Sequence, residues 1–328
     1  MKAFEYAAPR SEAEALDLLH AVPGRSEILA GGTDLVALMK SMVLRPERVV
    51  NIMEIPSLKG IEERADGSVV IGASETLDEV LASHYLTDYR AVTDAILGIN
   101  SMQLQCQGTI GGELCQRARC WFFRNGHGLL AGSELAEFGD NRDHAILGNL
   151  GPAKFVCGSR IAPALIALGA KLRIVGPREQ DEQLVAAEEF FQVPQNDQDR
   201  ETVLQPKQLL TQIILPPATA TSATYEVRPS VGPDYPLAAA AAALTMRNGV
   251  VVSARIVLGQ VAPIPWLSPE AAGALLGGTV NESRAAAAGV AAVTGAMPMS
   301  GNAHKIQLTQ VAVKRAVMLA AGLNPGGL

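Results

Sequence analysis

The fold of this chain is decided by two stretches that each place a glycine pair among apolar residues: Ile28-Leu29-Ala30-Gly31-Gly32-Thr33-Asp34-Leu35 and Gly108-Thr109-Ile110-Gly111-Gly112-Glu113-Leu114. A glycine pair that follows a strand lets backbone amides approach a diphosphate, because no Cβ shields them and positive φ carries no steric cost. A helix expected over 35–44 would add free first-turn amides and the positive end of its dipole. Together the two stretches indicate a nucleotide cofactor.

The two stretches do not match the commonest nucleotide-binding loops. No Gly-Lys-Ser/Thr follows either pair, and neither has the three-glycine spacing of the dinucleotide fingerprint. A P-loop and a Rossmann domain are therefore disfavoured. One glycine pair alone is usually a tight turn, so the prediction rests on the occurrence of both.

Composition bounds the class of protein. The chain has 328 residues, of which 48% are hydrophobic and 18% charged, and this leaves room for two or three domains. A formal net charge of −6 without a basic run disfavours nucleic acid and anionic membranes as partners. The amino terminus lacks the apolar stretch of a signal peptide, and the run over 237–244 is too short to span a bilayer. We therefore expect a cytoplasmic protein without direct membrane insertion.

The four cysteines are clustered in the sequence, at Cys106, Cys115, Cys120 and Cys157. Eight, four and thirty-six residues separate them, unlike the paired short spacings of zinc sites and bacterial ferredoxins. Buried reduced thiols are favoured over metal or cluster ligands. The five histidines also lack a metal-binding spacing. We predict no metal site and no catalytic residue in this chain.

The amino-terminal half alternates helices and strands. Ser11 and Glu14 form a capping box that begins a helix. A strand over 27–30, the first glycine stretch, its helix and a strand over 48–52 form a βαβ-like unit. A hairpin over 61–72 and two helices, one beginning at Thr76 and one over 86–97, are expected next.

The remaining elements are expected in this order: an ordered insertion over 117–153, a helix over 163–168, a strand over 170–175, an acidic loop over 179–201, a strand over 209–215, a boundary at 218–222, a hairpin with strands over 238–247 and 250–261, and helices beginning at Ser268, Asn281 and Lys305. The last third is thus a small α+β layer without a nucleotide loop of its own, as in a docking domain.

Three later segments of the chain belong to the same pattern as the two glycine stretches. They are Tyr225-Glu226-Val227-Arg228, Gly259-Gln260-Val261-Ala262-Pro263 and Ser300-Gly301-Asn302-Ala303-His304-Lys305. In this order they resemble the FAD-binding medium subunit of the molybdenum hydroxylases, a family that includes carbon monoxide dehydrogenase, xanthine dehydrogenase and aldehyde oxidoreductases. The resemblance covers almost the whole chain. It implies an α+β fold: a two-part FAD-binding domain of the vanillyl-alcohol-oxidase (PCMH) type at 1–217, with subdomains at 1–55 and 56–217, and a CO-dehydrogenase-flavoprotein C-terminal domain at 222–326.

The resemblance also implies a function. The chain would be an oxidoreductase subunit, active only within a complex that contains a small subunit with [2Fe–2S] clusters and a large molybdopterin subunit, arranged as a dimer of heterotrimers. It would pass electrons from a cluster through FAD to an external acceptor. The alternative is a scaffold subunit of the same complex that has lost FAD. A free-standing flavin oxidase is a weaker hypothesis, because no substrate domain is recognised.

The family positions carry over residue by residue to a set of expected FAD contacts. The first glycine stretch would wrap the diphosphate and part of the flavin, the second would hold the other side of the diphosphate, and two residues would lie near the isoalloxazine. The residues are, in sequence order, Ile28, Leu29, Ala30, Gly31, Gly32, Thr33, Asp34, Leu35, Ile99, Asn100, Thr109, Gly111, Gly112, Glu113, Ser159, Arg160 and Leu210.

Three of the positions depart from the family pattern. Glu113 replaces the usual Asn after the second glycine pair, Arg160 replaces the Asp expected to bind the adenosine ribose, and Glu226 replaces a frequent Lys. A carboxylate at Glu113 would repel a diphosphate unless it turns away, whereas Arg160 would attract one or face solvent. These changes motivate the scaffold alternative, although FAD binding is favoured. Asp140 and Asn141 are candidates to replace the ribose contact.

The insertion resembles, at its start, a region that holds an additional [4Fe–4S] cluster in relatives such as 4-hydroxybenzoyl-CoA reductase and a periplasmic aldehyde oxidoreductase. The matching residues are Gln116 to Cys120 and Phe122 to Arg124. The segment 121–155 contains no cysteine, however, and a cubane needs about four thiolates. We therefore predict no [4Fe–4S] cluster, and we expect Trp121-Phe122-Phe123 to form a small core of the insertion or a contact with a partner subunit.

Overall fold

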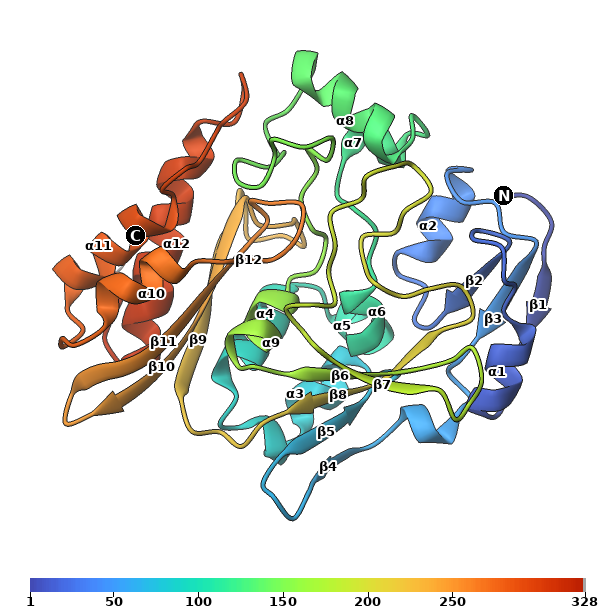
Figure 1. The fold of residues 1–328 in the computed structure, drawn as a ribbon, viewed down its shortest axis with the longest axis horizontal. Helices are drawn as coiled ribbons and strands as arrows, with labels where there is room; N and C mark the ends of the chain where they lie inside the picture. The colour runs from blue at the N-terminus through green and yellow to red at the C-terminus, as the bar shows by residue number, and fades with distance from the viewer. Residues whose placement is uncertain (327–328) are drawn as a thin grey trace.

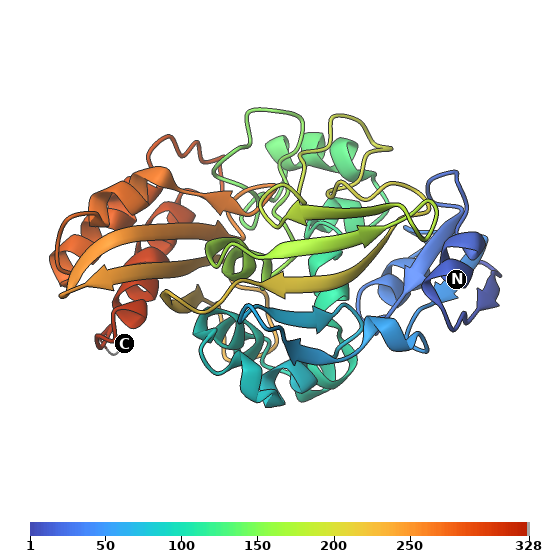
Figure 2. The same ribbon diagram turned by 60° about the horizontal axis from the view of Figure 1, so that its bottom comes forward.

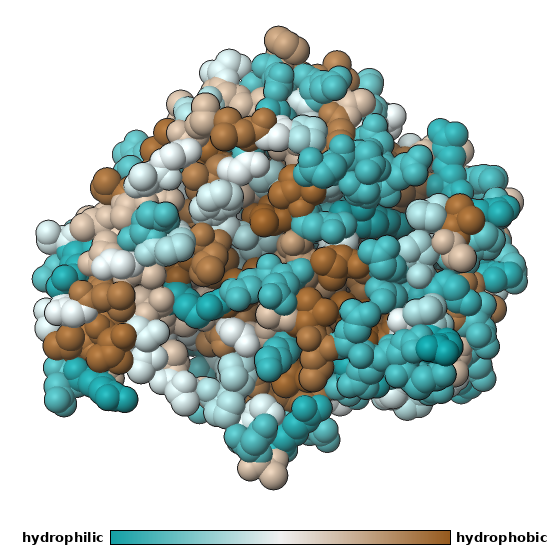
Figure 3. Space-filling model, in the orientation of Figure 1, coloured by the Kyte–Doolittle hydropathy of each residue, from teal (hydrophilic) through white to brown (hydrophobic). Residues whose placement is uncertain are grey.

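Three β-sheets follow one another along the chain in the computed structural model, which describes residues 1–326 (Figure 1). The amino-terminal and carboxy-terminal units lie at opposite ends of the molecule, with the middle sheet between them (Figure 2). Hydrophilic side chains dominate the surface over the amino-terminal unit in Figure 3.

The amino-terminal unit is a parallel three-stranded sheet with the order β1-β3-β2. Its elements are β1 (Glu5–Ala7), α1 (Glu12–Leu18), β2 (Ser26–Leu29), α2 (Leu35–Lys40) and β3 (Arg48–Asn51). The Ser11 hydroxyl accepts a hydrogen bond from the Glu14 amide, which confirms the expected cap. Strand β1 was not predicted. Helix α2 is shorter than predicted because Met42 has a φ of 61° and the Val43 amide turns back to the Leu38 carbonyl.

The middle unit is an antiparallel five-stranded sheet with the order β4-β5-β8-β6-β7. Its strands are β4 (Ile61–Glu63), β5 (Val69–Gly72), β6 (Lys171–Val175), β7 (Glu182–Ala186) and β8 (Leu209–Leu215). The predicted hairpin and the predicted strands near β6 and β8 are confirmed. The prediction of a loop over 179–201 is wrong for β7, since this edge strand shows no apolar alternation and forms by pairing with β6.

Short helices cover this sheet: η1 (Pro56–Leu58), α3 (Leu77–Ala82), η2 (His84–Leu86), α4 (Arg90–Gly98), α5 (Met102–Gln107), α6 (Ile110–Leu114) and α9 (Ala162–Ala167). The helix predicted over 86–97 is α4, which begins only at Arg90 after the 3-10 turn η2. The second glycine pair lies inside helix α6 and not in a turn after a strand. Thr109 caps α6 by accepting a hydrogen bond from the Gly112 amide at 3.1 Å.

The insertion is ordered, as predicted, and contains α7 (Trp121–Arg124) and α8 (Leu129–Phe138) at the top of Figure 1. Its small core contains Leu38, Ala118, Cys120, Phe123, Leu129, Leu130, Ala153 and Phe155. Phe123 thus has the expected role, whereas the Trp121 side chain is 72% exposed and lies outside this core.

The carboxy-terminal unit is a four-stranded antiparallel sheet with the order β12-β11-β10-β9, covered on one face by helices. Its elements are β9 (Thr221–Val227), β10 (Ala238–Arg247), β11 (Val250–Gly259), β12 (Trp266–Leu267), α10 (Pro269–Leu275), α11 (Glu282–Ala292) and α12 (His304–Ala320). The β10–β11 hairpin turns at Asn248 and Gly249, both with positive φ, as the sequence predicts.

Strand β10 joins this unit to the middle one because both of its faces are buried. Ala241 and Ala243 face α4 and α9 of the middle unit, whereas Ala238, Ala240 and Ala242 face α10 to α12. Successive side chains point to opposite faces of a strand, so a run of alanines lets helices approach the sheet from both sides.

The segment that follows α11 is fixed by a buried lysine at the start of α12. The Lys305 ammonium donates to the carbonyls of Asp143, His144 and Gln260, at 2.7–3.1 Å. Burial lowers the pKa of Lys305 to about 7, because the charged form loses hydration. This contact ties the insertion to the carboxy-terminal unit.

The double burial of β10 predicts a severe cost for a larger side chain at Ala241. We expect Ala241→Leu to lower the free energy of unfolding by about 1–3 kcal/mol, because added methyl groups would push α4 and α9 off the sheet. Val252→Leu, on the same hairpin at a side chain that is 47% exposed, should change it by less than about 0.5 kcal/mol. Urea unfolding of both variants measures the difference, and equal midpoints would contradict this packing.

Candidate functional site

A cavity of about 510 Å³ lies between the amino-terminal unit and the middle unit. Its walls include β2 with the first glycine stretch, residues of the loop 19–24, the second glycine stretch with Cys115 to Arg117, and residues of the segment 192–209 with Leu210 on β8. This volume is within the usual range for a small-molecule or cofactor site.

The two glycine stretches meet backbone to backbone beside this cavity. A Cβ at Gly31 would lie 1.7 Å from the Gln107 carbonyl oxygen, and a Cβ at Gly111 would lie 2.7 Å from the Ala73 carbonyl oxygen. Gly32 has a φ of +74°, which disfavours other residues. The glycines are therefore required by close approach and by backbone conformation.

The two stretches differ in the amides that they leave free. Within the described residues, the amides of residues 31–34 donate to no protein acceptor. In the second stretch, the amides of Ile110, Gly111 and Gly112 are engaged with the Glu75 carbonyl, the Ala73 carbonyl and the Thr109 hydroxyl. Only the first stretch offers a row of free donors at the cavity wall, where an anion would satisfy them.

Most of the predicted site residues line the cavity. Those that do are Ile28, Ala30, Gly31, Gly32, Thr33, Asp34, Leu35, Thr109, Gly111, Gly112 and Leu210. They come from three separate segments, which the fold brings together. Leu29, Ile99, Asn100, Glu113, Ser159 and Arg160 do not line it.

Those six residues are held elsewhere by their own contacts. Leu29 lies on β2 with its Cδ1 3.1 Å from the position that a Cβ at Gly32 would take, and Ile99 is 5% exposed within the core of the middle unit. Asn100 donates to the Val231 carbonyl, and the Ser159 hydroxyl accepts from the Ala162 amide at 3.1 Å. Their assignment to a cofactor stays a prediction without support from the cavity walls.

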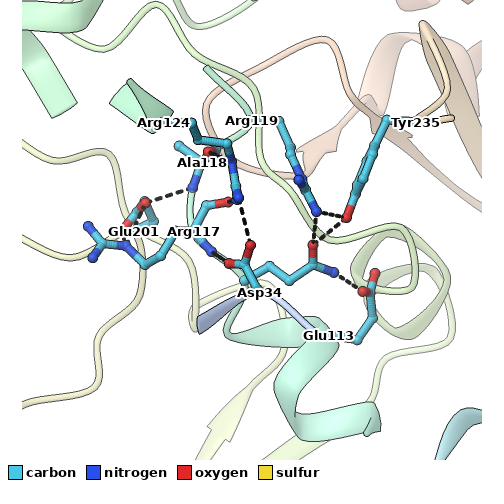
Figure 4. A network of polar contacts seen from close by, with 9 residues as sticks. Asp34, Glu113, Arg117, Ala118, Arg119, Arg124, Glu201 and Tyr235 are labelled. Atoms are coloured by element: carbon cyan, nitrogen blue, oxygen red, sulfur yellow. Dashed lines mark hydrogen bonds and ion pairs between the residues drawn. The ribbon is translucent and has the colours of Figure 1, made fainter. Parts of the chain in front are cut away.

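Asp34, at the end of the first glycine stretch, is bound by the start of the insertion (Figure 4). Its carboxylate accepts hydrogen bonds from the Arg117 amide at 2.9 Å and from the Arg124 guanidinium at 2.7 Å. Burial alone would raise the pKa of Asp34, but the hydrogen bond and charge of Arg124 hold it below its usual value. The negative charge at this wall of the cavity is therefore paired.

The same segment also fixes the far wall. The Arg117 guanidinium pairs with the Glu201 carboxylate at 2.9 Å, and that carboxylate also accepts from the Ala118 amide. Glu201 is the last residue of the acidic loop predicted over 179–201, and the segment 192–209 continues from that loop to the start of β8. Its Gln, Asn, Asp and Pro residues give no periodic signal, so only the fold identifies it as part of the cavity.

The three departures from the family pattern lie together and away from the cavity. The Glu113 carboxylate accepts from the Arg160 amide at 2.5 Å and from the Gln116 side chain. The Arg160 guanidinium forms a buried ion pair with Glu226 and also donates to the Gly98 carbonyl. A Cβ at Gly98 would meet the Glu226 carboxylate at 2.5 Å. Arg160 therefore neither faces solvent nor reaches the cavity, and Glu113 is turned away from it.

Asp140 and Asn141 also lie outside the cavity walls. Asp140 pairs with Arg142 on the surface, and the buried Asn141 side chain bonds the Ala136 carbonyl, Ser300 and the Gly301 amide. These contacts are within the insertion and to the α11–α12 segment. They give neither residue a position from which to replace the ribose contact.

All four cysteines are free thiols, and three of them are half-buried or buried. The buried Cys120 thiol contacts the His144 Nε2 at 3.3 Å, beside the core of the insertion. Among residues 1–326, no group of three or more His, Cys, Asp or Glu side chains is arranged to hold a metal ion.

Comparisons with known proteins cover nearly the whole chain. Residues 2–218 match the FAD-binding domain of molybdopterin dehydrogenases, and residues 223–320 match the CO dehydrogenase flavoprotein C-terminal domain. The medium chain of carbon monoxide dehydrogenase from Afipia carboxidovorans is 32% identical over 85% of this chain and 82% of its own. The FAD-binding subunit of an aldehyde oxidoreductase from Escherichia coli is 31% identical over 81% and 84%.

Solved structures agree with these relatives. Carbon monoxide dehydrogenase from Hydrogenophaga pseudoflava, in a form that lacks the Mo-pyranopterin moiety of its cofactor, contains a chain with a TM-score of 0.76 and 27% identity. The match covers 97% of both chains. In the described residues, no helix is both long and apolar enough to cross a membrane.

The buried Arg160–Glu226 pair predicts a stability phenotype. We expect Arg160→Gln to lower the free energy of unfolding by about 3–5 kcal/mol, because Glu226 would stay buried without its cation. The exchanged pair R160E/E226R should recover part of this loss. Arg178→Gln, which breaks the exposed Arg178–Asp181 pair, should cost less than about 1 kcal/mol. Denaturant unfolding measures all three, and a fully stable Arg160→Gln would contradict the role of the pair.

Proposed function

The chain belongs to the family of FAD-binding subunits of molybdopterin dehydrogenases, and on this premise we propose that it binds FAD in the glycine-lined cavity and passes electrons through it within a molybdenum hydroxylase complex. The observation that carries the proposal is the row of free amides at residues 31–34, which line a cavity of suitable volume inside the matched FAD-binding domain. Bound FAD supplies the exchange between one-electron and two-electron carriers.

The residues present fit this cofactor. The amides of the first glycine stretch would hold the diphosphate, as oriented N–H groups do in other anion sites. Ile28, Leu35 and Leu210 give the cavity apolar wall for the rest of the cofactor, and the polar segment 192–209 closes the opposite side. The second glycine stretch acts as a support, because its amides are engaged and its Gly111 lets the chain pack on Ala73.

We propose the wider assembly from the relatives. It contains a small iron–sulfur subunit that supplies electrons from [2Fe–2S] clusters and a large molybdopterin subunit that oxidises the organic substrate, as a dimer of heterotrimers. Electrons leave this chain for an external acceptor. The free thiols of all four cysteines are compatible with the reducing cytoplasm, where we place the complex.

A scaffold subunit without FAD is the second hypothesis, and the contacts in the structure weaken the observation that supports it. That observation is the presence of Glu113, Arg160 and Glu226 at positions where the family usually has other residues. The three side chains contact one another or their neighbours and do not line the cavity. They therefore leave the free amides accessible to a diphosphate.

The proposal predicts one FAD per chain in the purified protein, and its loss in Gly31→Ala. The added Cβ would overlap the Gln107 carbonyl oxygen, so the two glycine stretches must separate and the free amides must move. We expect the FAD affinity to fall at least tenfold, a change of about 1.4 kcal/mol. Flavin absorbance and cofactor extraction measure the occupancy.

A matched control is Gly273→Ala on α10, where a Cβ meets no atom within 4 Å. This variant should keep its FAD and gain about 0.5–1 kcal/mol of stability from the higher helix propensity of alanine. A folded complex without FAD would support the scaffold hypothesis, and full occupancy in Gly31→Ala would contradict the assigned site.

A further inference from the structure

Glu113 is placed where a charge would act on the cofactor site. It directly follows the Gly111-Gly112 pair that lines the cavity, and its side chain turns into the protein, where the residue is only 7% exposed. One carboxylate oxygen accepts from the Arg160 amide at 2.5 Å. The other accepts from the side chain of Gln116, a residue that itself lines the cavity (Figure 4).

The Glu113 carboxyl has hydrogen-bond donors but no cation of its own. The charges of Arg160 and Arg119 both act on Glu113, but the Arg160 guanidinium is paired with Glu226. The Arg119 guanidinium stacks on the Tyr235 ring at 3.8 Å and bonds its hydroxyl and Gln116. Among residues 1–326, no Lys, Arg or His forms an ion pair with Glu113.

The groups that face Glu113 come from each element packed around it. Arg119 follows α6, Arg160 and the Cys157 thiol precede α9, Glu226 lies on β9, and Tyr235 lies between β9 and β10. Burial raises the pKa of Glu113 to about 7, against the opposing effects of the Arg160 amide and of the Arg160 and Arg119 charges. Cys157 and Tyr235 are neutral near pH 7, because burial raises the pKa of each to about 12.

We propose that Glu113 takes up a proton when FAD binds, so that a neutral carboxylic acid, and not a carboxylate, lies behind the second glycine pair. The inference rests on the proposed function. A diphosphate held by the first glycine stretch would lie near this pair, because a Cβ at Gly112 would be 4.0 Å from the Ala30 Cβ. Its charge would repel a carboxylate through a poorly solvated protein layer, and protonation removes that repulsion. The neutral acid can stay buried because its carbonyl oxygen still accepts from the Arg160 amide. Its new O–H needs an acceptor, which the Gln116 Oε1 supplies when that side-chain amide turns over and its Nε2 donates to the Tyr235 hydroxyl.

The sign of the pH dependence follows from this linkage. The diphosphate raises the pKa of Glu113 above its value of about 7 in the free protein. Below that pH, Glu113 is protonated with and without FAD, so the affinity is constant. Above it, each FAD bound requires up to one proton, so the dissociation constant rises by up to tenfold per pH unit.

The test titrates the flavin-free full chain with FAD between about pH 6 and pH 9. Flavin fluorescence gives the dissociation constant, and calorimetry in two buffers of different ionisation enthalpy counts the protons taken up. We expect wild type to show the rising dissociation constant and proton uptake above about pH 7. Glu113→Gln should show neither, with the affinity of wild type at low pH.

The matched control is Asp199→Asn at the far wall of the cavity. Hydrogen bonds, first that from the Gln195 amide, lower the pKa of the half-buried Asp199, so it stays ionised across this pH range. Its neutralisation should shift the affinity at every pH and leave the pH dependence intact. A pH dependence lost equally in both variants would overturn the assignment to Glu113.

A second measurement keeps the proposal testable if Glu113→Gln fails to fold. The infrared difference spectrum of wild type on FAD binding near pH 8 should gain the C=O band of a protonated carboxyl group. FAD binding with a constant affinity, no proton uptake and no such band would overturn this inference and leave the proposed function in place. Absence of FAD binding at every pH would instead overturn the proposed function.

Discussion

The backbone contact between Gly31 and Gln107 is the constraint on which the rest of the site depends. The first glycine stretch belongs to a small parallel sheet and Gln107 to a helix that covers the antiparallel sheet, so this contact is where the two units meet. A backbone can approach another this closely only where a side chain is absent. Beside this contact, residues 31–34 line the cavity, and their amides donate to no acceptor in the described residues.

Ion pairs and hydrogen bonds of charged residues connect the segments that surround this contact. The segment 117–124 binds Asp34 of the first stretch, Glu201 of the far wall and, through Arg119, Tyr235 near the carboxy-terminal sheet. Arg160 and Glu226 pair across the middle and carboxy-terminal units. Removing one member of such a buried pair leaves an uncompensated charge, so each partner depends on the other to stay buried. In the insertion, an apolar core with Phe123 and Phe155 gives order to a segment that has few regular elements.

Local signals in the sequence were enough for many of the elements. The Ser11 cap, the hairpin at Asn248-Gly249 and the strand over 209–215 depend on residues within a few positions of one another, and the structure contains all three. Strand β7 and helix α6 were missed for the opposite reason. Strand β7 is stabilised by pairing with its neighbour β6. The two glycines in α6 have low helix propensity, and this helix forms because Thr109 caps it and Gly111 packs on Ala73.

The sequence by itself determined the family and the order of most elements, and it predicted the first glycine stretch as an anion site, because each of these rests on residue types at short or fixed spacings. The tertiary structure alone decided how Glu113, Arg160 and Glu226 act. Arg160 and Glu226 are 66 residues apart in the chain, and no pattern along the sequence shows that their charges meet in a buried space. The same holds for the cavity wall at 192–209, whose polar residues become part of a site only when Glu201 meets Arg117. Burial and pairing between distant segments are properties of the folded chain, and no pattern of neighbouring residues along the sequence records them.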